Sequence, residues 1–192
     1  MEHGFTWVQQ VPGLMLLEAH TATALLVMVG ILLFAIRARQ QLATADTIVP
    51  DEGFSARNIA EVLTEFITNL SESVIGHEGP KYVPLFGSLF IFILVANFLG
   101  LVPGFSPPTS SFYTNLGLGI VVFVAYHYFG VREHGVRYFK QFMGPMLLLA
   151  PLFILIEFFS HIFRPISLSI RLFGNMFGDH LVLEIFSDLT KV

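Results

Sequence analysis

Apolar residues dominate the chain in long runs, and the first of these runs extends from Leu16 to Ile36. A helix rises about 1.5 Å per residue, so a run of this length crosses the roughly 30 Å hydrocarbon core of a bilayer. Two further runs of similar length follow, at 84–102 and 112–130. The pattern therefore predicts three upright transmembrane helices.

A fourth segment, 145–190, is compatible with a helix throughout but is too long for one upright span. Residues 145–186 alone would form a helix about 63 Å long. The segment either breaks near Pro165 or Gly174 or lies steeply tilted in the membrane, and hydropathy does not distinguish these two arrangements. We expect one long, strongly tilted helix over 145–190.

A different pattern marks residues 54–75. Apolar residues recur there at steps of three and four across 59–74, whereas Glu61, Glu65 and Glu72 occupy the other faces, which is typical of an amphipathic helix. Helices that bind anionic lipid usually carry Lys and Arg on the polar face. The acidic face here favours contact with a partner protein or with water instead.

The composition is that of a membrane protein. Hydrophobic residues make up 54% of the 192, charged residues only 12%, and the mean hydropathy is +0.72. The absence of cysteine excludes disulfides and thiol-bound metal. The scattered Lys and Arg form no basic stripe, so nucleic acid is not an expected partner. We predict an all-α polytopic protein with a single membrane domain over 1–192 and no metal or cofactor.

The positions of the cations predict the orientation of the chain. Lys and Arg of short loops stay on the cytoplasmic side of a membrane, and the loop 103–111 carries no charge. This places the N-terminus outside and puts both charged loops, together with the amphipathic helix 54–75, in the cytoplasm. The cations that set this orientation are Arg37, Arg39, Arg57, Lys81, Arg132, Arg137 and Lys140.

Polar residues of the segment 145–190 align on a helix. At about 100° per residue, six of them fall within about 40° of one line. His180 and Glu184 share a different face. Ionisable groups at membrane depth are costly and indicate an ion or substrate path, although such a stripe can also lock two helices together by hydrogen bonds. Ser167 and Ser169 are expected to bond backbone carbonyls or to permit close helix packing. The six aligned residues are Glu157, His161, Arg164, Arg171, Asn175 and Asp179.

The stretch RPISLSIRLFGNMFGDHLVL, which begins at Arg164, resembles the signature of subunit a of the F-type ATP synthase, the membrane stator that faces a rotating ring of c subunits. PLFGSLFIFILVANFLGLVPGFSPPT resembles that family's second membrane helix and following loop, and HYFGVREHGVRYFKQFMGP its third helix and cytoplasmic turn. The resemblance covers 58–192. It implies a long tilted helix around the ring, followed by a second tilted helix that this sequence, ending at Val192, is expected to lack.

The resemblance also implies roles for individual residues. Arg171 corresponds to the essential arginine of the motif and Asn175 to its asparagine. His180 matches a position where relatives carry a carboxylate or histidine lining a proton path, and Glu157 a polar position one helical stretch earlier. The complete set of predicted proton-translocation residues is Arg171, Asn175, His180, Glu157, Glu184 and Asp179.

The implied function is that of a stator subunit, not an enzyme on its own, which couples ion flow to rotation and ATP synthesis. Its expected partners are the c-subunit ring, b-type peripheral stalk subunits, the lipid bilayer and protons, with Na⁺ left open as coupling ion, and its expected location is a bacterial inner membrane. A self-contained ion channel or transporter is the alternative. A hydrolase that uses Ser160 or Ser167 with His161 is disfavoured, because Ser160 and His161 face about 100° apart and no Gly-x-Ser-x-Gly elbow precedes them.

Overall fold

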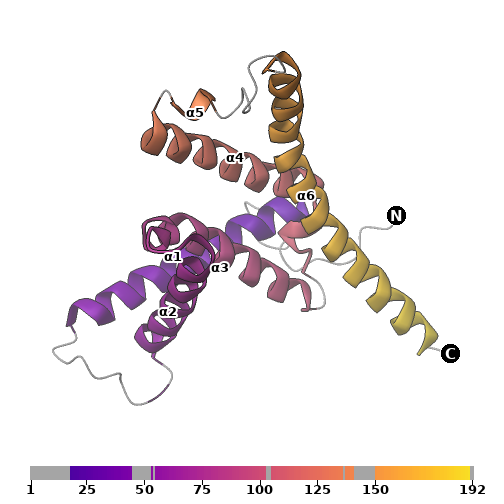
Figure 1. The fold of residues 1–192 in the computed structure, drawn as a ribbon. Coiled ribbons are helices and arrows are strands. Elements are labelled where there is room, and N and C mark those ends of the chain that lie inside the picture. The colour runs from indigo at the N-terminus through magenta and orange to yellow at the C-terminus, as the bar shows by residue number, and fades with distance from the viewer. Residues whose placement is uncertain are drawn as a thin grey trace. The chain divides into compact units, whose positions relative to one another are not determined.

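The computed structural model describes residues 18–44, 53, 55–102, 105–135, 137–140 and 150–190. Within these ranges every regular element is helical, which confirms the all-α fold class (Figure 1). The helices are α1 (Ala19–Thr44), α2 (Ala56–Ile75), η2 (Gly79–Tyr82), α3 (Val83–Gly100), η3 (Pro108–Ser110), α4 (Phe112–His134), α5 (Arg137–Lys140) and α6 (Ala150–Leu189).

Among the described residues, four helices are long and apolar enough to cross a membrane. They cover Ala19–Ala43, Gly79–Gly100, Phe112–His134 and Pro151–Leu189. The ranges predicted from the sequence are 16–36, 84–102, 112–130 and 145–190. Leu16, Leu17, Phe54 and 145–149 lie outside the described residues. Many large apolar side chains on these helices are exposed, as expected where lipid or another subunit replaces water as the surroundings.

The chain divides into two compact units, 1–108 and 109–192. In the first unit, α2 begins at the cap Ser55, whose side chain accepts a hydrogen bond from the backbone N–H of Asn58. Its buried residue Arg57 donates from Nε to Glu61 Oε1 over 2.8 Å and from its backbone to Gln41 Oε1 of α1 over 3.0 Å.

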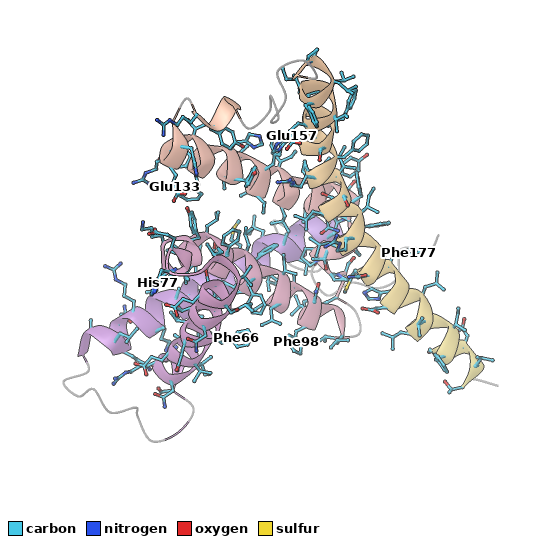
Figure 2. All side chains as sticks on the ribbon, in the orientation of Figure 1. Phe66, His77, Phe98, Glu133, Glu157 and Phe177 are labelled. Carbon is cyan, nitrogen blue, oxygen red and sulfur yellow. The ribbon has the colours of Figure 1, made fainter. Side chains whose placement is uncertain are left out.

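The apolar face of α2 is only partly covered. Ile67 is buried and lies against Gly87 of α3, whereas Val62 and Val74 are 65% and 77% exposed. Figure 2 shows Phe66 among the side chains of this unit, and its ring packs against Phe90 of α3 with centroids 6.1 Å apart. The exposed stripe agrees with an amphipathic helix that meets lipid or a partner.

In the second unit, α4 runs antiparallel to the first part of α6. Phe112 packs edge-on against Phe173, with ring centroids 6.3 Å apart. The ring centroids of Tyr126 and His161 are 5.9 Å apart. Residues further along α4 thus meet residues earlier in α6. Between these ends, Ser169 donates a hydrogen bond to the backbone carbonyl of Asn115 over 3.1 Å.

The two helices approach each other closely at Gly119. A Cβ atom at this position would lie 2.8 Å from Ser169 Oγ and 2.9 Å from the carbonyl oxygen of Pro165. Helices in lipid associate through close packing and hydrogen bonds, and small residues at the crossing permit both. Ser169 also donates to the Pro165 carbonyl over 2.7 Å, which confirms the interpretation of Ser169 as a packing and backbone-bonding residue.

The helix α6 is continuous through Pro165 and Gly174, the two positions at which the sequence left open a break. Pro165 lacks a backbone N–H and clashes with the preceding turn, and such residues kink helices rather than necessarily ending them. Figure 1 shows the two parts of α6 running in different directions.

Gly119→Ala should weaken the packing of α4 on α6, because the backbone carbonyl of Pro165 must move to accept the methyl group. We expect a loss of about 1–3 kcal/mol, measured as a shift in the midpoint of SDS-induced unfolding of the full chain in detergent micelles. Gly117→Ala is the matched control. A Cβ at Gly117 has no atom within 4 Å, and the substitution changes the intrinsic helix propensity by the same amount. Equal midpoints for the two variants would contradict the close approach.

Candidate ion-translocation site

The polar stripe of α6 divides into two environments. Its first part packs against α4: His161 is buried, Glu157 is half-buried, and the guanidinium carbon of Arg164 lies 5.2 Å from the centroid of the Tyr126 ring. An arginine over an aromatic face is attracted to the ring electrons. Figure 2 shows Glu157 on this part of the helix and Phe177 on the later part.

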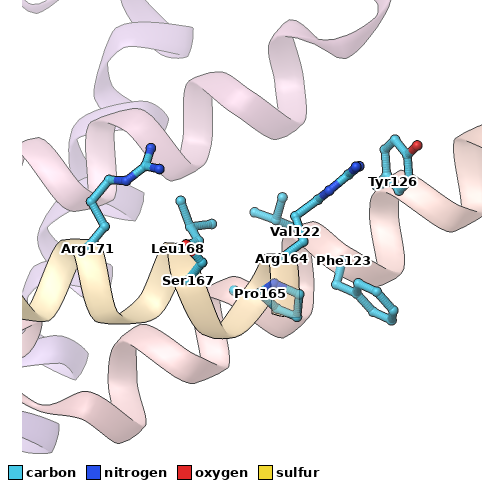
Figure 3. Close-up of a pocket in the computed structure, with 9 residues that line it drawn as sticks. Val122, Phe123, Tyr126, Arg164, Pro165, Ser167, Leu168 and Arg171 are labelled. Carbon is cyan, nitrogen blue, oxygen red and sulfur yellow. The ribbon is translucent and has the colours of Figure 1, made fainter. Parts of the chain in front are cut away.

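A pocket of about 280 Å³ lies between α4 and α6 beside the stripe. Arg164 and Arg171 both line it, and Figure 3 shows the two side chains extended on the same side of α6 with Leu168 between them. Val122 and Phe123 of α4 contribute to its apolar wall. The pocket therefore presents two permanent cations in otherwise apolar surroundings, which suits an anionic group.

Arg171 is exposed, and within the described part of the chain it has no ion pair. Its neighbour Ile170 is 55% exposed, so the guanidinium emerges from an apolar surface. A permanent charge in such a place is costly unless a partner or water compensates it. The arrangement therefore favours an anion supplied by something other than the described residues.

The later part of the stripe follows Arg171 along the same helix. Asn175 and Asp179 are exposed, and His180 is half-buried. The Nε2 atom of His180 is buried and has no hydrogen-bond partner among the described residues. The side chain of Glu184 lies outside the described part, so its predicted pairing with His180 stays a prediction.

Several residues of the site went unrecognised in the sequence. Asn115 is fully buried and donates from Nδ2 to the carbonyl of Thr109 over 2.7 Å. The one feature of the sequence that could have indicated Asn115 is that it is a lone amide at the start of an apolar run. His127 was not among the predicted site residues, but its ring lies 5.3 Å from that of His161, between centroids. No single-helix pattern relates His127 to His161, because the contact joins two helices.

The arrangement can exchange protons on both sides of Arg171. Glu157 and His161 precede this arginine on α6, and Asp179 and His180 follow it. Carboxylates and imidazoles take up and release protons, whereas a guanidinium in a protein does not. The described residues hold no group of three or more side chains suited to bind a metal ion.

Comparison with known proteins agrees with these features. Residues 21–192 match the family described as ATP synthase A chain. The chain is 44% identical over 190 residues to ATP synthase subunit a of Bdellovibrio bacteriovorus, an alignment that covers 98% of this chain and 83% of that protein.

Two further relatives are similar over shorter stretches. ATP synthase subunit a 2 of Syntrophotalea carbinolica is 48% identical over 136 residues, which cover 71% of this chain and 58% of the relative. ATP synthase subunit a of a Sulfurihydrogenibium species is 38% identical over 167 residues, which cover 86% of this chain and 77% of the relative. Subunit a is a non-catalytic membrane subunit of the synthase, and this chain, an integral membrane protein with the same signature, belongs to the ATP synthase A chain family.

Proposed function

We propose that the chain is the proton-translocating stator subunit of the membrane sector of ATP synthase, with Arg171 facing an acidic side chain on the rotor. The exposed guanidinium of Arg171 on a long apolar helix carries this proposal. Membership of the ATP synthase A chain family supports it.

The chemistry of arginine explains the role. A guanidinium keeps its charge at working pH and cannot pass a proton along, yet it favours the ionised form of a carboxylate that comes close. A rotor carboxylate that reaches Arg171 loses its proton there and regains one only after it has moved past. Arg171 thereby prevents protons from crossing without rotation.

Two half-channels supply and remove the protons. With the N-terminus outside, the end of α4 and the beginning of α6 lie on the cytoplasmic side. Glu157 then belongs to the cytoplasmic half-channel. The polar groups that follow Arg171 belong to the outer half-channel, in which Asn175 orients water or the rotor carboxylate and the titratable groups exchange protons. These groups are Asp179, His180 and Glu184.

The proposed partners are the c-subunit ring along α6 and the b-type subunits of the peripheral stalk. The proposed membrane is a bacterial inner membrane, because the similar subunits come from bacteria. Protons are the coupling ion, and Na⁺ is the alternative, because residues that select the ion lie largely on the rotor. The membrane potential supplies about 2.3 kcal/mol per charge per 100 mV.

Arg171→Ala should abolish ATP-driven proton pumping by the assembled synthase in inverted membrane vesicles, with a loss of about a hundredfold or more. Arg171→Lys should restore little, because an ammonium lacks the planar fork. Arg132→Ala removes an exposed arginine at the end of α4 and should pump like the wild type. Wild-type pumping by Arg171→Ala, at normal assembly, would refute the proposal.

The full chain reconstituted alone in liposomes should show no proton flux above that of empty liposomes, because the path is completed by the rotor. A membrane potential set by K⁺ and valinomycin drives the flux, and an internal pH dye reports it. Rapid flux that disappears in Arg171→Ala would instead favour the self-contained channel.

A further inference from the structure

A cluster of rings and charges lies where α4, α5 and α6 meet, and the action of Arg171 does not use it. His161 is 5% exposed, and its Nε2 atom lies 3.3 Å from Oε1 of Glu157. The centroids of the His127 and Tyr126 rings lie 5.3 and 5.9 Å from that of His161. Two imidazoles, a phenol and a carboxylate therefore share one small volume.

The hydrogen bonds of the cluster leave proton-exchanging atoms available. His127 places Nδ1 2.8 Å from the carbonyl oxygen of Phe123, so in the neutral ring Nδ1 carries the proton and Nε2 is the acceptor. Tyr138 of α5 is buried, and its ring lies 6.5 Å from that of Tyr126, between centroids. Burial, followed by the charge of Tyr126, raises the pKa of the Tyr138 phenol. Tyr138 thus stays protonated and does not act as a base.

Groups of both signs lie around His161. Glu157 and Arg164 face it from α6 and the rings of Tyr126 and His127 from α4. The Tyr138 ring of α5 packs against those two α4 rings. An imidazolium at His161 would be attracted by Glu157 and opposed by Arg164. An imidazole that has both an acceptor carboxylate and other rings beside it can take up a proton at one nitrogen and release one from the other, which a relay requires.

The pocket between α4 and α6 extends from Tyr126, whose ring packs beside His161, to Arg171. Tyr126 and Arg164 line one end of the pocket and Arg171 lines the other (Figure 3). His161 precedes Arg171 by ten residues, about 15 Å along a helix. A volume of about 280 Å³ greatly exceeds the ~30 Å³ that one water molecule occupies, and guanidinium groups at both ends can hold such waters.

We propose that His161 is the proton-accepting residue of the half-channel on this side of Arg171, with His127 as its partner and Glu157 as the next acceptor. This inference rests on the proposed function. A hydronium ion formed by the rotor carboxylate transfers its proton to the His161 imidazole and becomes water. The imidazolium then breaks one N–H bond and passes that proton to the Glu157 carboxylate, where an O–H bond forms. His161 returns to its neutral state.

The test measures passive proton conductance of the assembled membrane sector in vesicles stripped of the catalytic sector. His161→Gln should lower the conductance at least about tenfold, because the amide does not exchange protons in this pH range. His127→Gln should lower it less. His134→Gln is the matched control, since His134 is exposed in the last turn of α4, and it should conduct like the wild type. Conductance is normalised to the amount of assembled complex.

Rescue separates a relay from a merely structural histidine. Added imidazole should restore conductance in His161→Ala, where it replaces the missing proton carrier, and should leave the wild type unchanged. Wild-type conductance in His161→Gln overturns the proposal. Reduced conductance in His161→Ala that imidazole does not restore also overturns it, since packing alone would then explain the loss. If His161→Gln assembles poorly, the conductance of His127→Gln relative to that of the wild type decides: an unchanged conductance overturns the proposal.

ATP-driven pumping by Arg171→Ala is measured in the same membranes. This measurement distinguishes failure of the proposed function from failure of the histidine relay. If Arg171→Ala does not pump but His161→Gln conducts normally, only the histidine relay fails. If Arg171→Ala pumps like the wild type, the proposed function itself fails.

Discussion

The packing of α4 on α6 in the second unit depends on the absence of a Cβ atom at Gly119. In lipid there is no hydrophobic force to press helices together, so contact relies on close packing and on hydrogen bonds that proximity allows. Because Gly119 has no Cβ, the backbones of α4 and α6 come near enough for Ser169 to reach the carbonyl of Asn115. The same closeness sets the antiparallel register and so determines which residues of α4 stand beside each residue of α6.

That register gives one line of polar residues two different tasks. Where α4 lies alongside, the stripe is enclosed, and His161 meets aromatic and imidazole rings from another helix. Further along α6, Arg171, Asn175 and Asp179 are exposed. A buried group can exchange protons with chosen neighbours, whereas an exposed cation in an apolar surface can act on a partner that moves past it. Enclosure by α4 therefore gives His161 a different environment from that of Arg171, although both belong to one stripe.

The helices and the arginine were predictable from the sequence, whereas the pairing of helices was not. Apolar runs and the 3.6-residue period belong to single segments, so α1, α3, α4 and the alignment of Arg171 with Asn175 could be read directly. The roles of Asn115 and His127 depend on contacts between segments, and a lone polar residue in an apolar run does not reveal its partner. The continuity of α6 at Pro165 was equally undecided, since proline permits either a break or a kink.

The proline within α6 has a mechanical consequence. Having no N–H, Pro165 cannot donate the usual helical hydrogen bond to the carbonyl of His161, four residues earlier. The bending stiffness of α6 is therefore reduced at Pro165, within the part of the helix that packs against α4. Because α4 packs on both sides of this point, at His161 and at Phe173, any flexure of α6 at Pro165 must be accompanied by a shift of α4.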